Sequence, residues 1–286
     1  MARIADLIAA GRTFSFEFFP PKTEEAQAQL ATTIAELAPL KPSFFSVTYG
    51  ALGSTRTRTR DVVVELARAG SIPPMAHLTC VGHVRSEIDL LLGEYKAAGV
   101  ENILALGGDL PADPSQLGPT DFHFAMDLVE HLRENFDVSI GVAAHPEVHP
   151  RSPSRGSDRA HLAAKLRRAD FGMTQFFFEI EHYTRMIDEL SALGVNKPVV
   201  PGIMPVTNKG QIVKMAQMSG AAIPSWLSDR LAKFDDPADI RRVGVEVATK
   251  LSSDLLAAGA PGLHFYTLNR STATREIYSN LGLGRG

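Results

Sequence analysis

The 286-residue sequence lacks several features that would place a protein in a special class. It has one cysteine, Cys80, which excludes an internal disulfide framework and fits a reducing cytoplasm. No stretch approaches the roughly 18 to 20 uninterrupted apolar residues that a membrane helix requires. The net charge is only −3, so bulk electrostatics indicate neither a nucleic-acid nor a membrane partner. We therefore expect a cytoplasmic protein.

Other special segments are also missing. Residues 1–14 are too short and too polar for a secretory signal and are typical of a short amphipathic helix. The only dense basic run, RTRTR at 56–60, is typical of a solvated loop or a helix start. The sequence has no linker and no low-complexity tract, and 44% of its residues are hydrophobic, enough for a sizeable core. We predict one domain spanning residues 1–286.

What the sequence does contain is a regular alternation of apolar runs and helical patterns. Most of the runs are nearly continuous, as expected of parallel strands covered on both faces. Eight strands with helical crossovers in about 250 residues predict a (β/α)8 TIM barrel, and we expect two or three helices in 205–261. An open doubly wound sheet is the main alternative, but ALGGDLP lacks the GxGxxG spacing. The eight predicted strands are 13–19, 44–50, 74–80, 102–108, 139–145, 173–179, 198–204 and 262–268.

Polar side chains recur where these predicted strands end, which is where barrel enzymes place their catalytic groups. The adjoining loops alone explain part of this pattern. They do not explain Glu17 and Gln175, which lie inside aromatic runs and would have to point inward to be useful. The strand-end candidates are Glu17, Thr48, His77, Asp109, His145, Gln175, and Asn269 with Arg270.

Glu17 raises the sharpest question, because FSFEFFPPK at 14–22 sets one carboxyl group among four phenylalanines. Burial favours the protonated form of a carboxyl group, and a protonated carboxyl group can act as a general acid. The alternative is a buried glutamate satisfied by an arginine or by backbone donors.

A metal-dependent barrel hydrolase or lyase is a second hypothesis. It would use Glu17 and Asp109 with three histidines, His77, His145 and His149. The paired HxH expected at the first strand of such enzymes is missing, and the prolines of HPEVHP indicate a loop at 145–150. We therefore predict no metal site.

Eight motifs together resemble those of the methylenetetrahydrofolate reductase family, over about residues 13–283. They are FSFEFFPPK, FFSVTYGA, HLTC, LALGGDLP, AAHPEVHP, TQFFFE, PGIMPVTN and HFYTLNRS. The resemblance implies a bacterial-type (β/α)8 catalytic domain without a regulatory extension. It implies reduction of 5,10-methylenetetrahydrofolate to 5-methyltetrahydrofolate, which feeds methionine synthesis. The electrons would come from NADH or NADPH, normally through bound FAD, and NADH is expected from bacterial relatives.

The same resemblance implies roles for individual residues. Glu17 would be the general acid that opens the methylene bridge to an iminium cation, and Asp109 would hold the pterin ring beside it. Substrate-binding residues would be Gln175, Arg270, Tyr266 and Leu268. Cofactor-binding residues would be Thr48, His77, Gly108, Asp109, His145, His149, Asp158 and Lys165.

The sequence departs from the family pattern mainly where the family holds FAD. Arginine and tyrosine are usual at the positions of Gly107 and His145, and asparagine and arginine at those of His161 and Ala164. Lys209 replaces an aromatic residue. Losing two arginines removes charged donors from an anionic diphosphate, although Lys165, Arg167 or Arg168 could restore the charge. We expect weak FAD binding or none, with direct hydride transfer from NADH. A non-catalytic folate- or nucleotide-binding relative stays open as an alternative, and a homo-oligomer is compatible with the sequence.

Overall fold

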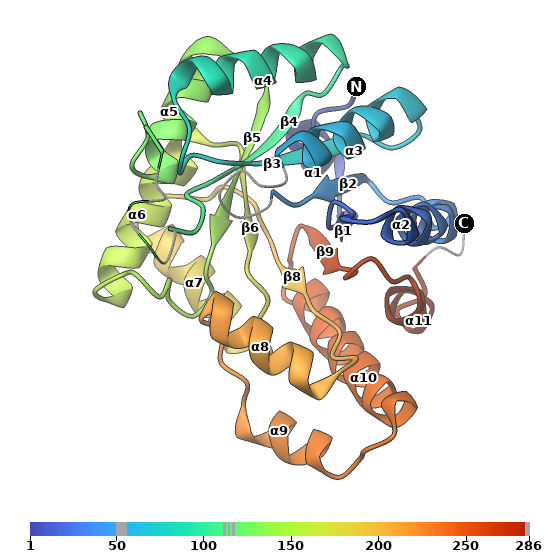
Figure 1. Ribbon diagram of the computed structural model, residues 1–286. Helices are drawn as coiled ribbons and strands as arrows, with labels where there is room; N and C mark the ends of the chain where they lie inside the picture. Colours follow the sequence, from blue (N-terminus) through green and yellow to red (C-terminus); the bar gives the residue numbers. More distant parts are fainter. Residues whose placement is uncertain (50–55, 111–112, 114, 116–117, 284–286) are drawn as a thin grey trace.

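The computed structural model describes residues 1–49, 56–110, 113, 115 and 118–283. Within these ranges, nine parallel strands form one sheet in the order β7-β6-β5-β4-β3-β2-β1-β9-β8 (Figure 1). The strands are β1 Thr13–Phe18, β2 Phe44–Val47, β3 Pro74–Thr79, β4 Asn102–Leu106, β5 Ser139–Ala144, β6 Phe171–Thr174, β7 Val199–Val200, β8 Gly202–Ile203 and β9 Gly262–Tyr266.

The sheet is closed by a single stretch of chain that belongs to both of its edges. The run predicted as one strand at 198–204 is two short strands, because Pro201 between them has no N–H to donate to a ladder. β7 pairs with β6 on one side and β8 pairs with β9 on the other. The Pro201 carbonyl still accepts a hydrogen bond from His264 N, at 2.9 Å. The predicted (β/α)8 barrel is confirmed, with its seventh strand divided.

One predicted strand is misplaced. The run 173–179 was expected to be strand throughout, but β6 covers Phe171–Thr174 and the aromatic residues after it leave the sheet. Phe176 and Phe178 pack into a cluster with Met204 and residues of the helices that follow β8, whereas Phe177 packs against the main core. Burial of three aromatic rings in a loop, not strand pairing, accounts for this run.

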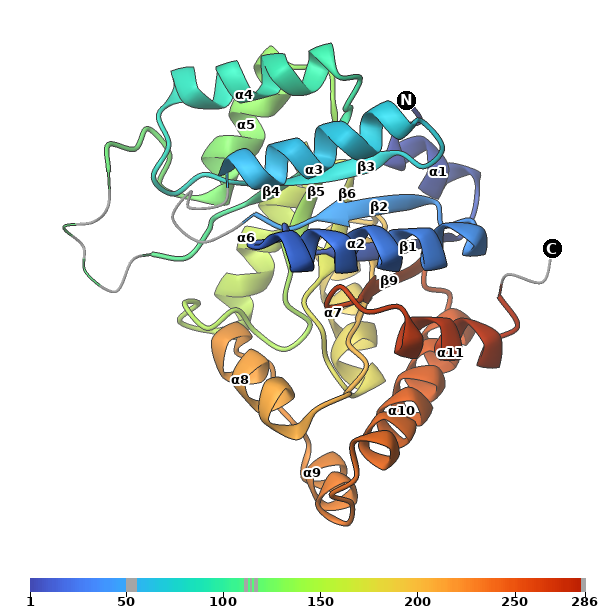
Figure 2. The ribbon, with the colours of Figure 1, turned by 45° about the vertical axis from the view of Figure 1, so that its right-hand side comes forward.

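Helices surround the strands (Figures 1 and 2). The 205–261 segment holds three, as expected, and α9 lies farthest from the strands. RTRTR begins α3. The helices are α1 Ile4–Ala10, α2 Glu24–Leu37, α3 Arg56–Ala69, α4 Arg85–Ala97, α5 Ala125–Asn135, α6 Arg155–Arg168, α7 Ile180–Ala192, α8 Lys209–Ser219, α9 Ser225–Ala232, α10 Pro237–Ala257 and α11 Thr272–Asn280, with a 3-10 turn at Ala38–Leu40. No helix in the described ranges is long and apolar enough to cross a bilayer.

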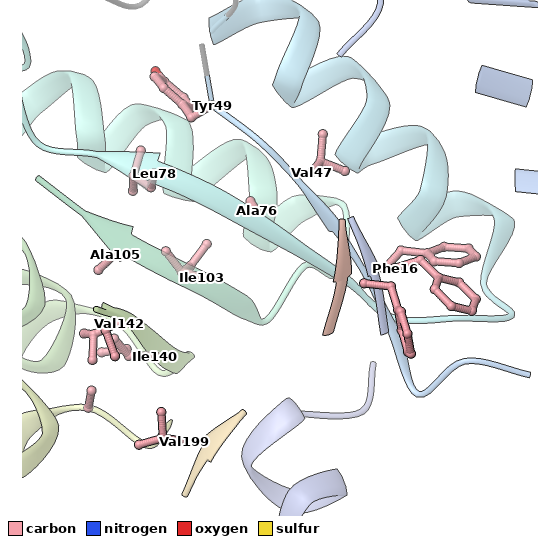
Figure 3. Close-up of a cluster of buried hydrophobic side chains, with 14 of the residues drawn as sticks. Phe16, Val47, Tyr49, Ala76, Leu78, Ile103, Ala105, Ile140, Val142 and Val199 are labelled. Carbon is pink, nitrogen blue, oxygen red and sulfur yellow. The ribbon is translucent and has the colours of Figure 1, made fainter. Parts of the chain in front are cut away.

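Successive side chains of a strand point to opposite faces of the sheet, so they contribute either to the core under the helices or to the barrel interior. In β1, Phe16 and Phe18 face the helices, and Phe16 packs against Phe45, Phe265 and Tyr278 at ring-centroid distances of 5.2 to 6.4 Å. Figure 3 shows this outer layer, to which successive strands contribute Phe16, Val47, Ala76, Ile103 and Ile140. The intervening residues of β1, Ser15 and Glu17, therefore face the barrel interior.

The N-terminal end of the barrel is plugged by α1. Ile4 packs on an interior apolar cluster that consists of Phe44, Met75, Leu104, Phe171 and Met173. The fully buried Asn102 fixes the plug: its Oδ1 accepts from Ile4 N at 2.8 Å, and its Nδ2 donates to the carbonyls of Ala2 and Pro74. With this end apolar and closed, the polar interior residues lie toward the opposite end.

We expect Asn102→Ala to lower the free energy of unfolding by about 1 to 3 kcal/mol, because it leaves the buried Ile4 N–H without its acceptor. Urea denaturation followed by circular dichroism measures the change. Asn280→Ala, at an exposed residue with one long hydrogen bond to Thr249, is the control. Equal midpoints for the two variants would contradict the role of Asn102.

Candidate active site

Glu17 lies inside the barrel between two histidines. Its neighbours in register are Ser46 of β2 and Tyr266 of β9, and the residue is only 4% exposed. Glu17 Oε2 lies 3.1 Å from His264 Nε2 and 3.4 Å from His77 Nε2. The partners of the buried carboxyl group are therefore imidazoles from β9 and β3, not the arginine or backbone donors considered as the alternative.

Two serines extend this cluster on either side. Ser15 Oγ lies 2.8 Å from His264 Nδ1, and Ser46 Oγ lies 2.6 Å from His77 Nε2. Burial is the main cause that lowers the pKa of His77 to about 4, although the nearby Glu17 carboxylate acts in the opposite direction. His77 is therefore neutral at pH 7. We define Ser15, Glu17, Ser46, His77 and His264 as the interior polar cluster.

Tyr266 borders the interior polar cluster on the β9 side. Its hydroxyl group donates to the Thr174 carbonyl at 2.8 Å, and its ring meets the His264 ring edge-on at a centroid distance of 5.4 Å. Burial, assisted by Glu17, raises the Tyr266 pKa well above its usual value, so the hydroxyl stays protonated. Gly202 makes room for the ring, since a Cβ atom there would lie 2.6 Å from it.

The loop after β9 is joined to the loop after β1. Asn269 Oδ1 accepts from Phe19 N at 2.8 Å, and Asn269 Nδ2 donates to Phe19 O at 2.9 Å. Leu268 and Asn269 both have positive φ, 53° and 55°, a conformation that is uncommon for leucine. The loop leaves the Arg270 side chain exposed at the end of the barrel to which Glu17 points.

A second group of predicted residues gathers after β5. The rings of His145 and His149 meet at a centroid distance of 4.5 Å. Asp158 accepts from His149 N at 3.1 Å and forms an ion pair with Arg159. Lys165 Nζ donates to the Ala143 carbonyl at 2.9 Å.

Burial shifts the basic groups of this region toward neutrality. It lowers the pKa of His145 to about 3 and that of Lys165 to about 8. The pKa of His149 is also lowered, chiefly by burial and then by the charge of Arg151. Both histidines are therefore neutral at pH 7, and they can donate or accept hydrogen bonds without adding charge.

The remaining predicted site residues lie in the loops after β2, β4 and β6. Gly108 has φ 85° and a Cβ there would lie 2.9 Å from Thr79, so glycine is required, and Asp109 after it is exposed. Thr48 N donates to the Phe18 carbonyl at 2.9 Å. Gln175 was predicted to lie inside a strand. It lies directly after β6 instead, because that strand ends at Thr174.

Gln175 and His145 line a small pocket that also touches the end of α8. Gly220 (φ 74°) ends this helix against Pro150, where a Cβ atom would clash with the proline ring, and Ala222 N donates to Glu147 Oε2 at 2.8 Å. The turn after α8 is thereby packed on the loop after β5.

The structure thus forms two groups at the C-terminal end of the barrel. Glu17, His77 and Tyr266 share the first, and His145, His149, Asp158 and Lys165 share the second. Glu17 lies near the end of β1 and Asp109 lies in the loop after β4, so both are at this end of the barrel. No contact joins them within the described ranges. Ser15, Ser46 and His264 were not predicted. Ser15 is two residues from Glu17, and His264 is two residues from Tyr266, a spacing that is the signal of a shared strand face.

The positions that depart from the family pattern have other partners or none. Lys209 Nζ forms an ion pair with the exposed Asp235 at 3.2 Å, and His161 is exposed on α6. Arg167 donates to the Leu193 carbonyl, and Arg168 pairs with Glu134, both at the far end of α6. Neither arginine can therefore supply charge to the strand-end loops. The suggestion that Arg167 or Arg168 restores the lost charge is wrong. No group of three metal-ligating side chains occurs among the described residues.

A closed parallel barrel with titratable groups at the C-terminal strand ends is the architecture of a (β/α)8-barrel enzyme. The sequence model of the family "Methylenetetrahydrofolate reductase" matches residues 3–282. This chain belongs to that family and is an oxidoreductase. The 5,10-methylenetetrahydrofolate reductase of Salmonella typhimurium is 39% identical over 95% of this chain and 91% of its own. That of Escherichia coli K12 is 38% identical over the same shares.

A solved structure supports the fold independently. A Clostridium thermocellum protein, described as binding two copies of 5-methyl-5,6,7,8-tetrahydrofolic acid, superimposes with a TM-score of 0.72. It is 14% identical and covers 97% of each chain. At this identity the likeness concerns the barrel alone.

Because His77 is buried in its neutral form, we expect the stability of the folded protein to decrease at acid pH. Its pKa is about 4 in the folded protein and near 6.5 in the unfolded chain, so between these values the unfolded chain binds more protons. The free energy of unfolding should therefore fall as pH drops from 6.5 toward 4, by on the order of 2 kcal/mol at pH 5 for this residue. Urea titrations at pH 7 and pH 5 measure it. His77→Gln should reduce the loss between the two pH values, whereas His123→Gln, at an exposed histidine, should not. An unchanged loss in His77→Gln would exclude His77 as its source.

Proposed function

We propose that this protein reduces 5,10-methylenetetrahydrofolate to 5-methyltetrahydrofolate with NADH as the direct hydride donor. In this proposal FAD binds weakly or not at all. The reduction of methylenetetrahydrofolate follows from the family and its relatives. The observation that carries the site assignment is Glu17, a buried carboxyl group held between two imidazoles beside Tyr266.

Glu17 is proposed as the general acid. A proton on the bridging nitrogen N10 opens the imidazolidine ring and leaves an iminium cation at N5. Hydride addition to the methylene carbon then completes the methyl group, so one proton and one hydride are consumed per turnover. His77 is neutral at pH 7 and adds no positive charge beside Glu17. His264 and Ser15 fix the orientation of the carboxyl group.

The folate ring would lie over the interior polar cluster. Gln175, directly after β6, lines the small pocket, and Asp109, in the loop after β4, is exposed; both are proposed to hydrogen-bond the pterin. Tyr266 and Leu268 would form apolar walls that keep water from the iminium. Arg270 has no ion-pair partner within the described ranges and is free to meet a carboxylate of the substrate.

The group after β5 is proposed as the dinucleotide side of the site. A flavin or a nicotinamide donor both supply a hydride, and the iminium accepts it from either, so the chemistry does not require FAD. The departures support direct transfer, because Gly107 and Ala164 stand where the family pattern has arginine and neither supplies a charged donor. Thr48, Gly108, His149, Asp158 and Lys165 would contact the donor. The protein would act in the cytoplasm, on small molecules.

Replacing Glu17 by glutamine should lower kcat for methylenetetrahydrofolate reduction by about 10²- to 10⁴-fold, because the amide cannot donate the proton that opens the ring. The fold should persist, since glutamine can still hydrogen-bond the flanking imidazoles. Anaerobic oxidation of NADH measures the rate, and circular dichroism checks the fold. Glu25→Gln, at an exposed residue of α2, is the matched control. A Glu17→Gln enzyme with normal kcat would refute the assignment.

The purified protein should be colourless and active with NADH and methylenetetrahydrofolate, and added FAD should change the rate less than twofold. The visible absorption spectrum and an anaerobic assay with and without FAD measure this. A yellow protein with one FAD per chain, or activity that appears only with FAD, would show that the flavin route operates.

A further inference from the structure

Arg151 reaches from one strand-end loop to another. It lies in the loop between β5 and α6, yet its Nη2 is 3.4 Å from the carbonyl oxygen of Gly108 after β4. The same nitrogen is 3.5 Å from the point where a Cβ atom on Gly107 would lie. The guanidinium therefore lies beside a position without a side chain, at a distance at which a Cβ atom would be in ordinary van der Waals contact with it.

The loop holds Arg151 in this place. Arg151 N donates to His149 Nδ1 at 3.1 Å, and Ser152 N donates to the His149 carbonyl at 2.9 Å. Ser152 Oγ in turn donates to Asp158 Oδ1, which also accepts from His149 N. The backbone around Arg151 is thus anchored to the first turn of α6.

The guanidinium is largely unsatisfied. The Gly108 carbonyl is the only hydrogen-bond acceptor of its side chain in the described part of the chain, and no carboxylate there lies within ion-pair distance. Most of its five N–H donors therefore face solvent. Surface arginines elsewhere commonly have carboxylate partners, as Arg60 has in Asp61 and Glu94.

The surroundings of Arg151 favour an anion. Its charge and that of Lys165 both lower the pKa of His149, whereas the carboxylates of Asp158 and Asp109 act in the opposite direction. The nearby carboxylate of Asp158 is already engaged by Arg159 and by the loop. The charges of Arg151 and Lys165 thus both act at one neutral imidazole that can also donate a hydrogen bond, a combination suited to the oxygens of a diphosphate.

We propose that Arg151 binds the diphosphate of a bound dinucleotide, NADH in the ternary complex proposed above. The inference rests on the proposed function for the identity of the donor. It identifies Arg151, outside the motifs that carry the family resemblance, as a positively charged group beside Gly107. Arg151 would act on binding of the donor and not on the folate chemistry.

Steady-state kinetics of Arg151→Met with NADH test the proposal. We expect KM for NADH to rise about 10- to 100-fold, the effect of losing a charge-assisted hydrogen bond. The KM for methylenetetrahydrofolate should stay within twofold of the wild-type value. Arg151→Lys should recover part of the loss, because it keeps the charge without the planar fork. Arg275→Met, at an exposed arginine of α11, is the control.

A phosphate-free donor separates this role from a structural one. With reduced nicotinamide riboside, wild type and Arg151→Met should have equal kcat/KM, because the donor has no diphosphate to lose. Unchanged KM for NADH, or an equal loss with both donors, would overturn the proposal.

Direct binding keeps the test independent of turnover. Titration of NADH fluorescence should give a Kd that rises in Arg151→Met, even if the wild type proves unable to reduce folate, which would refute the proposed function alone. Titration with FAD distinguishes the source of the diphosphate. A Kd that rises for FAD but not for NADH would overturn the assignment to the nicotinamide donor.

Discussion

The structure depends on how one buried carboxyl group is satisfied. Glu17 on β1 can be held in the barrel interior only because β3 and β9 bring His77 and His264 to it from either side. These strands reach it only in a closed barrel with this register. An isolated carboxylate in such a place would cost several kcal/mol. The position of the proposed acid therefore depends on the fold, because a change in strand register would separate Glu17 from both imidazoles.

The barrel interior is divided along its axis. Near α1 it is apolar and filled by Phe44, Met75 and Phe171. Above that layer lies the interior polar cluster. Closure is achieved where Pro201 interrupts pairing and Gly202 admits the Tyr266 ring, so the weakest part of the sheet adjoins the site. Apolar packing supplies stability at one end, which allows the other end to hold buried polar groups.

The sequence predicted the barrel well, because buried parallel strands and amphipathic helices leave separate periodicities. It failed where local composition and tertiary packing disagree. The aromatic run after Thr174 has strand-like residues but is buried in a loop, and one proline divided a strand of correct composition. Two members of the interior polar cluster, Glu17 and His77, could be picked out from the sequence because they lie near the ends of predicted strands. His264 was hidden in an apolar run, and Arg151 acquires its neighbours from another loop, which no local pattern records.

The contact between Gly220 and Pro150 limits which amino-acid substitutions the two loops can accept. Because a Cβ atom on residue 220 would clash with the Pro150 ring, the turn after α8 and the segment that carries Arg151 are packed directly on each other. A side chain at residue 220 therefore requires a change at residue 150. Exchanges of these loops between related enzymes should move residues 145–152 and 219–222 together, because the two segments pack on each other.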